Sequence, residues 1–304
     1  MANLKERLET HLACGVSQES VARAMGITGG VLSAWRKGRY SGDNERVAKL
    51  VEEYLRRQED VTRELSAFKK DFDFVSTSVF RDIETGVRLA DLRGEIRVIV
   101  GASGLGKTTA LKRLKASNET IVFVEPYRGI RNNRFMDKLA RAAGVQVKGS
   151  FGDYFEALVE HLSGSGRTII VDEAENLPLQ ALDALRRIND FTGCGVVLCG
   201  MTSFLVNLKA YQRDYGYIYN RTSIPVVLRP LTGEDVEAMT ATMIERIVAP
   251  HIWHDACHGV GRDLRMIVQE TMRVADLNNV PATDTNGYAK VIKTVTAQLG
   301  RIYA

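Results

Sequence analysis

Two short stretches of the sequence carry residue types that could act on a nucleotide. The first runs Gly101-Ala-Ser-Gly-Leu-Gly-Lys-Thr108, and its pattern G-x-x-x-x-G-K-[ST] is typical of a loop whose main-chain N–H groups surround phosphate oxygens. In such a loop Lys107 would reach the β- and γ-phosphates of ATP, and the hydroxyl of Thr108 would be a ligand for Mg²⁺. The residues predicted to contact the nucleotide here are Gly101, Ser103, Gly104, Gly106, Lys107, Thr108 and Thr109.

The second stretch, Thr168-Ile-Ile-Val-Asp-Glu173, is an apolar run that ends in two carboxylates. We expect Asp172 to hold the metal, directly or through water, and Glu173 to activate a water molecule against the γ-phosphate. A parallel sheet would place this pair beside the phosphate-binding loop, because ligands bind at the carboxyl ends of its strands. The two stretches together predict Mg²⁺-dependent hydrolysis of ATP as well as binding.

The elements around these stretches follow an α/β pattern. From about residue 75 to residue 230, short β-branched runs alternate with helical patterns, which is typical of βαβ units in a parallel sheet. The apolar runs predict five strands, at 96–100, 120–124, 168–171, 195–199 and 223–228, with helices near 107–117, 132–143, 151–163 and 178–191.

The ends of the chain differ from this core because they show only helical patterns. Four such patterns, at 4–12, 18–25, 29–37 and 43–58, precede a charged stretch. The last block begins at Thr232, a residue type that favours the helix N-cap. We therefore expect an all-α domain over 1–62, a charged linker over 63–73, an α/β core over 74–230 and a small helical domain over 231–304.

The core resembles the AAA+ ATPases in its phosphate-binding loop and its strand ending in Asp172-Glu173. The resemblance implies a polar sensor of the γ-phosphate at Thr202, after the strand at 195–199. It also implies that Arg221 serves as an arginine finger toward a neighbouring subunit. In the segment Gly261-Arg-Asp-Leu-Arg265 it implies a second sensor, Arg265, with Arg262 as the fallback, presented by a helical lid.

The first domain resembles the helix-turn-helix of phage repressors. The resemblance rests on Gln18-Glu-Ser-Val-Ala-Arg-Ala-Met-Gly-Ile27 followed by Leu32 and Trp35. The second helix of this motif, at 29–37, would present Arg36 and Lys37, with Arg39 just after it. These cations suit phosphates better than base edges. Weak, non-specific DNA contact and a protein-interaction module both remain open for this domain.

Composition limits the class of protein. The 304 residues are 45% apolar, which is enough for a sizeable core, and 41 basic against 37 acidic residues give a net charge of +4, which permits contact with phosphates. No apolar run approaches the ~20 residues needed to cross a bilayer, and the four cysteines form no C-x-x-C pair. We expect a cytoplasmic chain with no membrane partner.

Nearly the whole chain resembles the transposition proteins typified by the B protein of phage Mu. The order of domains, the string Tyr40-Ser-Gly-Asp-Asn-Glu-Arg-Val47 and the motif Phe74-Val-x-Thr77 carry this resemblance. It implies a bacterial host cell, an ATP-dependent helical filament of identical subunits on double-stranded DNA, delivery of that target DNA to a transposase, and hydrolysis that disassembles the filament. Non-specific DNA contacts are implied at Arg128, Arg131, Arg134 and Lys148.

Two other functions remain open. A helicase loader of the same ATPase class would also bind ATP and DNA, although the first domain carries no recognisable helicase-binding extension. A nucleotide-switched transcription regulator would need a base-reading helix, whereas Gly29 and Gly30 occupy the start of this one.

Overall fold

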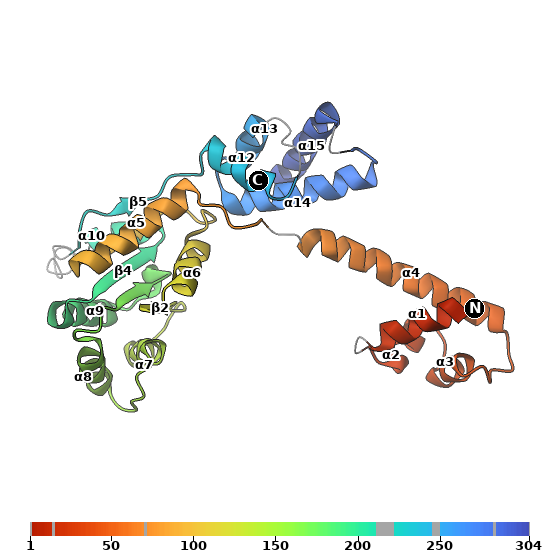
Figure 1. Ribbon diagram of the computed structural model, residues 1–304, viewed down its shortest axis with the longest axis horizontal. Coiled ribbons are helices and arrows are strands. Elements are labelled where there is room, and N and C mark those ends of the chain that lie inside the picture. Colours follow the sequence, from red (N-terminus) through yellow and green to blue (C-terminus); the bar gives the residue numbers. More distant parts are fainter. Residues whose placement is uncertain are drawn as a thin grey trace. The chain divides into compact units, whose positions relative to one another are not determined.

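The computed structural model describes residues 2–13, 16–69, 72–210, 222–244, 250–281 and 284–303. Contacts within the chain divide it into two units, Met1–Asp71 and Phe72–Ala304. Each unit has its own hydrophobic core, and Figure 1 shows the elements of both.

The first unit consists of four helices, as the sequence predicts. Val21, Leu32 and Trp35 are fully or almost fully buried in its core, and Gly26 makes the turn between the second and third helices in the left-handed region, with φ 69°. The fourth helix continues further than expected, so most of the stretch predicted as a charged linker is helical. The four are α1 (Ala2–Ala13), α2 (Gln18–Ala24), α3 (Gly29–Arg36) and α4 (Asn44–Lys69).

The second unit contains a five-stranded sheet in the order β2-β3-β4-β1-β5, in which every pair is parallel. This confirms the predicted α/β fold class. The last strand is shorter than the sequence predicts, since only two of its residues form a ladder with β1. The strands are β1 (Ile96–Val100), β2 (Ile121–Val124), β3 (Thr168–Val171), β4 (Gly195–Gly200) and β5 (Val226–Val227).

Helices cover both faces of the sheet because successive strand residues point to opposite sides. Ile99 and Val197 lie in the core formed with α5 and α6, whereas Val98 and Val196 lie in the core formed with α7, α8 and α9. The helices are α5 (Ser78–Arg93), α6 (Lys107–Ser117), α7 (Asn132–Ala143), α8 (Phe151–Leu162), α9 (Leu179–Thr192) and α10 (Thr202–Ala210). Helices α5 and α10 were not predicted from the sequence.

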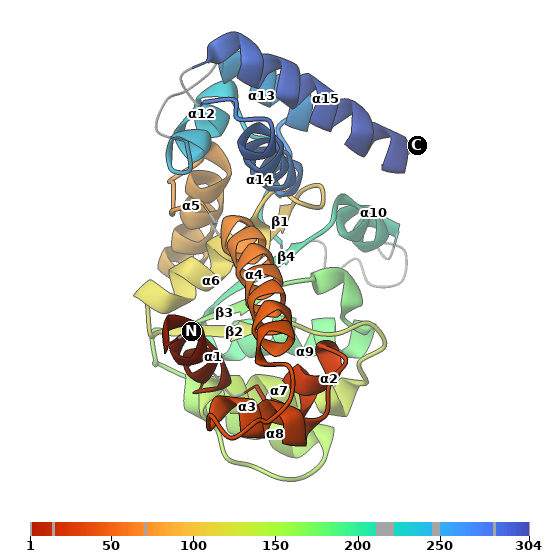
Figure 2. The same cartoon turned by 90° about the vertical axis from the view of Figure 1, so that its right-hand side faces the viewer.

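Four further described helices form the C-terminal part of the second unit, and they group together in both views (Figures 1 and 2). They bury Trp253, Leu264 and Ile292 in a core continuous with that of α5 and α6. Among described helices, none is long and apolar enough to cross a membrane. The four are α12 (Gly233–Ala241), α13 (Pro250–Cys257), α14 (Gly261–Leu277) and α15 (Thr285–Tyr303).

A buried carboxylate joins these helices to the α/β part. Asp235, 5% exposed, closes a capping box with Thr232 at the start of α12 and accepts hydrogen bonds from the N–H of Ser78, at 2.8 Å, and from its hydroxyl, at the start of α5. Burial raises the pKa of Asp235, but the hydrogen bonds from Ser78 and Thr232 outweigh this, so its pKa lies below the ordinary 3.8. The ionised carboxylate therefore stabilises two helix starts at once.

Replacing this carboxylate should destabilise the second unit in a pH-dependent way. We expect Asp235→Asn to lower the free energy of unfolding by about 1–3 kcal/mol at neutral pH, because one carboxylate oxygen becomes an NH₂ group that cannot accept the hydrogen bonds from Ser78 or Thr232. A lowered folded-state pKa contributes stability above the unfolded value, which is lost as pH falls through the folded value. The difference between parent and variant should therefore shrink below pH ~4, as measured by denaturant unfolding.

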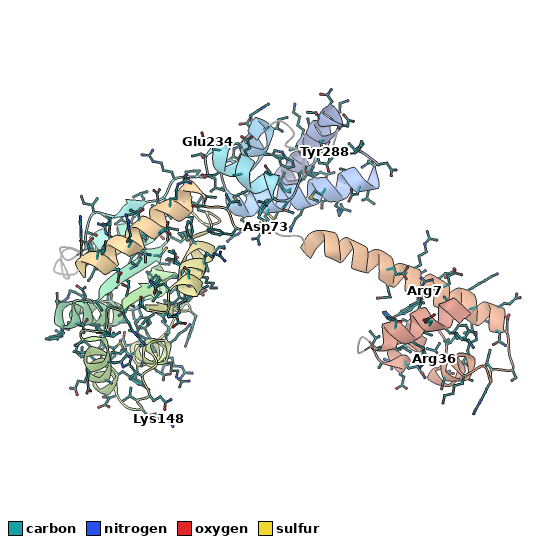
Figure 3. All side chains as sticks on the ribbon, in the orientation of Figure 1. Arg7, Arg36, Asp73, Lys148, Glu234 and Tyr288 are labelled. Carbon is teal, nitrogen blue, oxygen red and sulfur yellow. The ribbon has the colours of Figure 1, made fainter. Side chains whose placement is uncertain are left out.

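The neighbouring variant Glu234→Gln is the matched control, since Glu234 is exposed on the same helical turn and is labelled in Figure 3. It should lower the free energy of unfolding by less than about 1 kcal/mol, the usual contribution of an exposed first-turn charge. An Asp235→Asn protein as stable as the parent at neutral pH would contradict the role given to this carboxylate.

Candidate functional site

The predicted phosphate-binding loop lies between the end of β1 and the start of α6. Gly104 and Gly106 have φ of 83° and 90°, in the left-handed region where a side chain is strained. Gly101 is fixed by close packing, because a Cβ there would lie 2.9 Å from Cβ of Leu228. Helix α6 has no side-chain cap and no acidic residue in its first turn, so its N-terminus is suited to an anion such as a phosphate.

The ammonium of Lys107 lies over this loop. Its Nζ donates to the carbonyl oxygens of Gly101, at 2.8 Å, and Ala102, at 2.7 Å. Ser103 and Thr109 are exposed beside it. The loop thus combines a positive side chain with a helix N-terminus, which is the arrangement that holds a triphosphate.

Asp172 follows β3 directly and is 1% exposed. Its Oδ1 accepts a hydrogen bond from the N–H of Glu173 at 3.0 Å, while its Oδ2 is buried without a hydrogen-bond partner in the described structure. Burial raises the pKa of Asp172, and the nearby Thr108 hydroxyl and Lys107 ammonium oppose that rise. An unpaired buried carboxylate oxygen beside a hydroxyl supplies the hard oxygen ligands that Mg²⁺ prefers.

Glu173 is exposed and takes up the left-handed conformation, with φ 50°. Partial desolvation of its carboxylate raises the pKa of Glu173, as do the negative charges of Glu125, Asp172 and Glu175, whereas a hydrogen bond from Asn176 opposes the rise. A carboxylate with a raised pKa at the edge of a nucleotide site is suited to accept a proton from water.

Two residues that the sequence analysis missed hold this region together. Asn176 donates from Nδ2 to Oε2 of Glu173, at 3.0 Å, and to the carbonyl of Pro126, at 3.2 Å. Glu175 accepts from the N–H of Met201 at 3.1 Å, just after β4. Asn176 follows Glu173 by three residues across a short 3₁₀ turn, Ala174–Asn176, and such i, i+3 spacing is the signal that could have indicated the pair.

Of the other predicted nucleotide contacts, the structure describes Thr202, Arg262 and Arg265. Thr202 is exposed and begins α10. At the start of α14, the N–H of Arg262 donates to the carbonyl of Gly104 at 3.1 Å, so the fallback residue Arg262 lies against the phosphate-binding loop. The preferred Arg265 is exposed three residues further along α14. Arg221 lies outside the described residues.

Two of the candidate DNA contacts, Arg36 and Arg134, form ion pairs with carboxylates of their own unit, and the others are exposed. Arg36 pairs with Glu9 on α1, with Nε 2.7 Å from Oε1, and also bonds to the Gln18 side chain on α2, so its guanidinium serves the packing of its own unit. Arg134 pairs with Asp137 at 3.1 Å but stays largely exposed. The remaining candidates are exposed, and Figure 3 labels Lys148 on the loop between α7 and α8; they are Lys37, Arg39, Arg128, Arg131 and Lys148.

Comparison with known proteins agrees with this geometry. Residues 92–208 match the family described as AAA domain. The chain is 26% identical over 225 residues to the "ATP-dependent target DNA activator B" of Escherichia phage Mu, covering 73% of this chain and 71% of that protein. It is also 26% identical over 243 residues to the "Mu-like prophage FluMu DNA transposition protein B" of Haemophilus influenzae, covering 78% and 83%.

Among solved structures, the Aeropyrum pernix ORC2 protein, determined with ADPNP and ADP, superposes with a TM-score of 0.57. The match covers 75% of this chain and 71% of that one at 14% identity, and it supports the fold. The phosphate-binding loop, the carboxylates after β3 and the relatives agree: residues 92–208 form the AAA domain of an ATPase, and the chain is similar over about three quarters of its length to B transposition proteins of Mu-like phages.

Proposed function

We propose that this protein binds target DNA in an ATP-dependent way during DNA transposition. ATP-bound subunits would assemble as a helical filament on double-stranded DNA, deliver that DNA to a transposase and stimulate it, and hydrolysis would disassemble the filament. The observation that carries the proposal is the nucleotide site around Lys107 and Asp172 in a chain whose relatives are named for target DNA activation and transposition. We place this activity in the cytoplasm of a bacterial host cell.

In the proposed reaction Lys107 and the N-terminus of α6 bind the β- and γ-phosphates of ATP. Thr108 and Asp172 would hold Mg²⁺, which supplies neutralisation of the phosphate charge that develops during transfer. Glu173 orients the attacking water and accepts its proton, and Asn176 fixes the direction of the Glu173 carboxylate.

Three further side chains would complete the site. Thr202 would sense the γ-phosphate from the end of β4, and Arg265, or Arg262 against the loop, would contact the nucleotide from the lid. Arg221 would act in the site of a neighbouring subunit, where a guanidinium stabilises the transition-state charge.

Two variants should distinguish the residues needed to bind ATP from those needed to hydrolyse it. We expect Lys107→Ala to abolish both, because the loop loses its phosphate-binding cation. Glu173→Gln should retain ATP binding and lower the rate of hydrolysis by about 10²–10⁴-fold, the usual contribution of a general base. Nucleotide binding by fluorescence and phosphate release measure the two steps. Turnover at the parent rate by Glu173→Gln would show that another group activates the water.

The pH dependence of hydrolysis should reveal the role of Asn176. Its hydrogen bond lowers the pKa of Glu173, so Asn176→Ala should raise that pKa and move the acidic limb of the kcat profile to higher pH. Asn278→Ala, at the exposed C-terminal end of α14, is the control and should keep the parent profile. A slower Asn176→Ala enzyme with an unshifted limb would limit Asn176 to a structural role.

Electron microscopy with ATP and a long duplex tests the proposed function as a whole. The parent should form regular filaments on DNA of any sequence, Lys107→Ala should form none, and filaments of Glu173→Gln should persist because hydrolysis is blocked. Binding should weaken steeply with salt as phosphate contacts release counterions. Occupancy of one defined site irrespective of nucleotide would instead support a transcription regulator, and recruitment of a helicase without filaments would support a loader.

A further inference from the structure

Helix α7 exposes a row of cations. Arg131, Arg134, Lys138 and Arg141 have spacings of i, i+3, i+7 and i+10 and are all exposed, so they lie along one side of the helix. The opposite side packs into the core through Phe135, Met136, Leu139, Ala140 and Ala143. Helix α7 carries no acidic side chain that is exposed to solvent.

Stabilisation of the helix explains Arg141, which lies in the last turn, but not the cations at the N-terminal end of the row. Arg131 is the N-cap and Arg134 lies in the first turn, which contains no acidic residue and has no side-chain cap. Cations at a helix N-terminus are unfavourable, since the N–H groups there already carry partial positive charge. The N-terminal end of α7 therefore carries a concentration of positive charge, which a bound external anion would stabilise.

The only acidic residue of α7 lies beneath the row. Asp137, 8% exposed, accepts a hydrogen bond at Oδ1 from Nε of Arg141, at 2.9 Å, and at Oδ2 from Nη1 of Arg134, at 3.1 Å. Tyr154 of α8 donates its hydroxyl to the same carboxylate at 3.3 Å. The hydrogen bond from Arg141 lowers the pKa of Asp137, which keeps the carboxylate ionised at neutral pH.

This contact fixes the two arginines without covering them. The side chains of Arg134 and Arg141 are 66% and 73% exposed, against 12% for Asp137. A guanidinium has five N–H donors, and the described contacts of each arginine commit one to Asp137. The spacing of seven residue steps between them spans ~10 Å along the helix, or about three phosphate steps of one DNA strand. Lys138 differs, because it donates to the main-chain carbonyl of Glu125.

We propose that Asp137 is a positioning residue that holds Arg134 and Arg141 as a pair of phosphate contacts, so that duplex DNA runs along α7. The proposal rests on the DNA binding proposed above and extends it from the loop bearing Arg128 and Arg131 to the far end of the helix. Asp137 itself does not contact DNA. It converts two flexible side chains into a preorganised pair, which reduces the entropy lost on binding.

A second copy of the chain is the competing occupant of this row. Helix α8 exposes Asp153, Glu156 and Glu160, which could pair with the cations of α7 in a neighbouring molecule. DNA is favoured because the cations lie at phosphate-like spacing and include a helix N-terminus, where an anion is bound best.

The test measures the affinity of the full-length protein for a fluorescent duplex of arbitrary sequence over a series of salt concentrations, with a non-hydrolysable ATP analogue. Arg141→Gln should weaken binding roughly fivefold at 0.15 M salt and reduce the slope of log K against log salt by about 0.9, the value for one lost phosphate contact. Arg187→Gln on α9 is the matched control, because Arg187 is 59% exposed and pairs with Asp183 in the same way. It should bind as the parent does.

The variant Asp137→Asn distinguishes a positioning role of Asp137 from a purely electrostatic effect of its negative charge. The variant gains one positive charge, so non-specific attraction predicts tighter DNA binding, whereas loss of positioning predicts weaker binding with a smaller salt slope. Asp137→Glu should restore part of the affinity. Thermal unfolding checks that each variant is folded. If Asp137→Asn fails to fold, the surface variant Arg141→Gln still tests whether α7 contacts DNA.

Three results would overturn the proposal in different ways. Tighter binding by folded Asp137→Asn, or Arg141→Gln binding as Arg187→Gln does, would remove the pair from the DNA path while leaving the proposed function intact. If Arg141→Gln lost self-association but kept the DNA affinity of the parent, the row would be assigned to a second copy of the chain. A parent protein that binds no duplex under any nucleotide condition would remove the proposed function itself.

Discussion

The parallel pairing of β1 and β3 with the same central strand is the constraint on which the rest of the site depends. Both strands pair with β4, so both end at one edge of the sheet, and hydrogen bonds continue past their ends: Gly101 donates to Gly200 at 3.2 Å and Asp172 donates to Val124 at 3.0 Å. The loop and the carboxylates are therefore positioned by main-chain bonds. The Oδ2 oxygen of Asp172 is left without a hydrogen-bond partner in the described structure.

The sequence predicted the elements whose hydrophobic pattern is uninterrupted and missed those that depend on contacts. The bounds of β1, β3 and α6 agree with the prediction. Helix α5 was not predicted because Gly86 interrupts its apolar face, yet in the structure Gly86 faces the sheet, where a Cβ would lie 2.9 Å from Cδ1 of Ile99. That contact joins distant parts of the chain and leaves no local signal in the sequence.

The candidate site shows the same division. Lys107, Thr108, Asp172 and Glu173 could be identified because their chemistry follows from residue type and spacing. The supporting residues could not, since Asn176 acts through the carbonyl of Pro126 and Glu175 through the N–H of Met201, both at the ends of other strands. Main-chain carbonyl and N–H groups are common to nearly all residue types, so the sequence does not indicate which of them will be the partner. Only the folded sheet reveals them.

Two arginine–carboxylate pairs show why residue type alone could not assign the DNA contacts. In the first unit Arg36 is the covered partner, with its side chain 22% exposed against 53% for Glu9, so pairing holds the guanidinium within the fold. In α7 the carboxylate is covered and the arginines are exposed. A buried acid costs free energy unless its partners compensate for it, and here compensation leaves most guanidinium donors facing solvent. Which partner is buried thus decides whether an arginine stabilises its own domain or remains available to a phosphate.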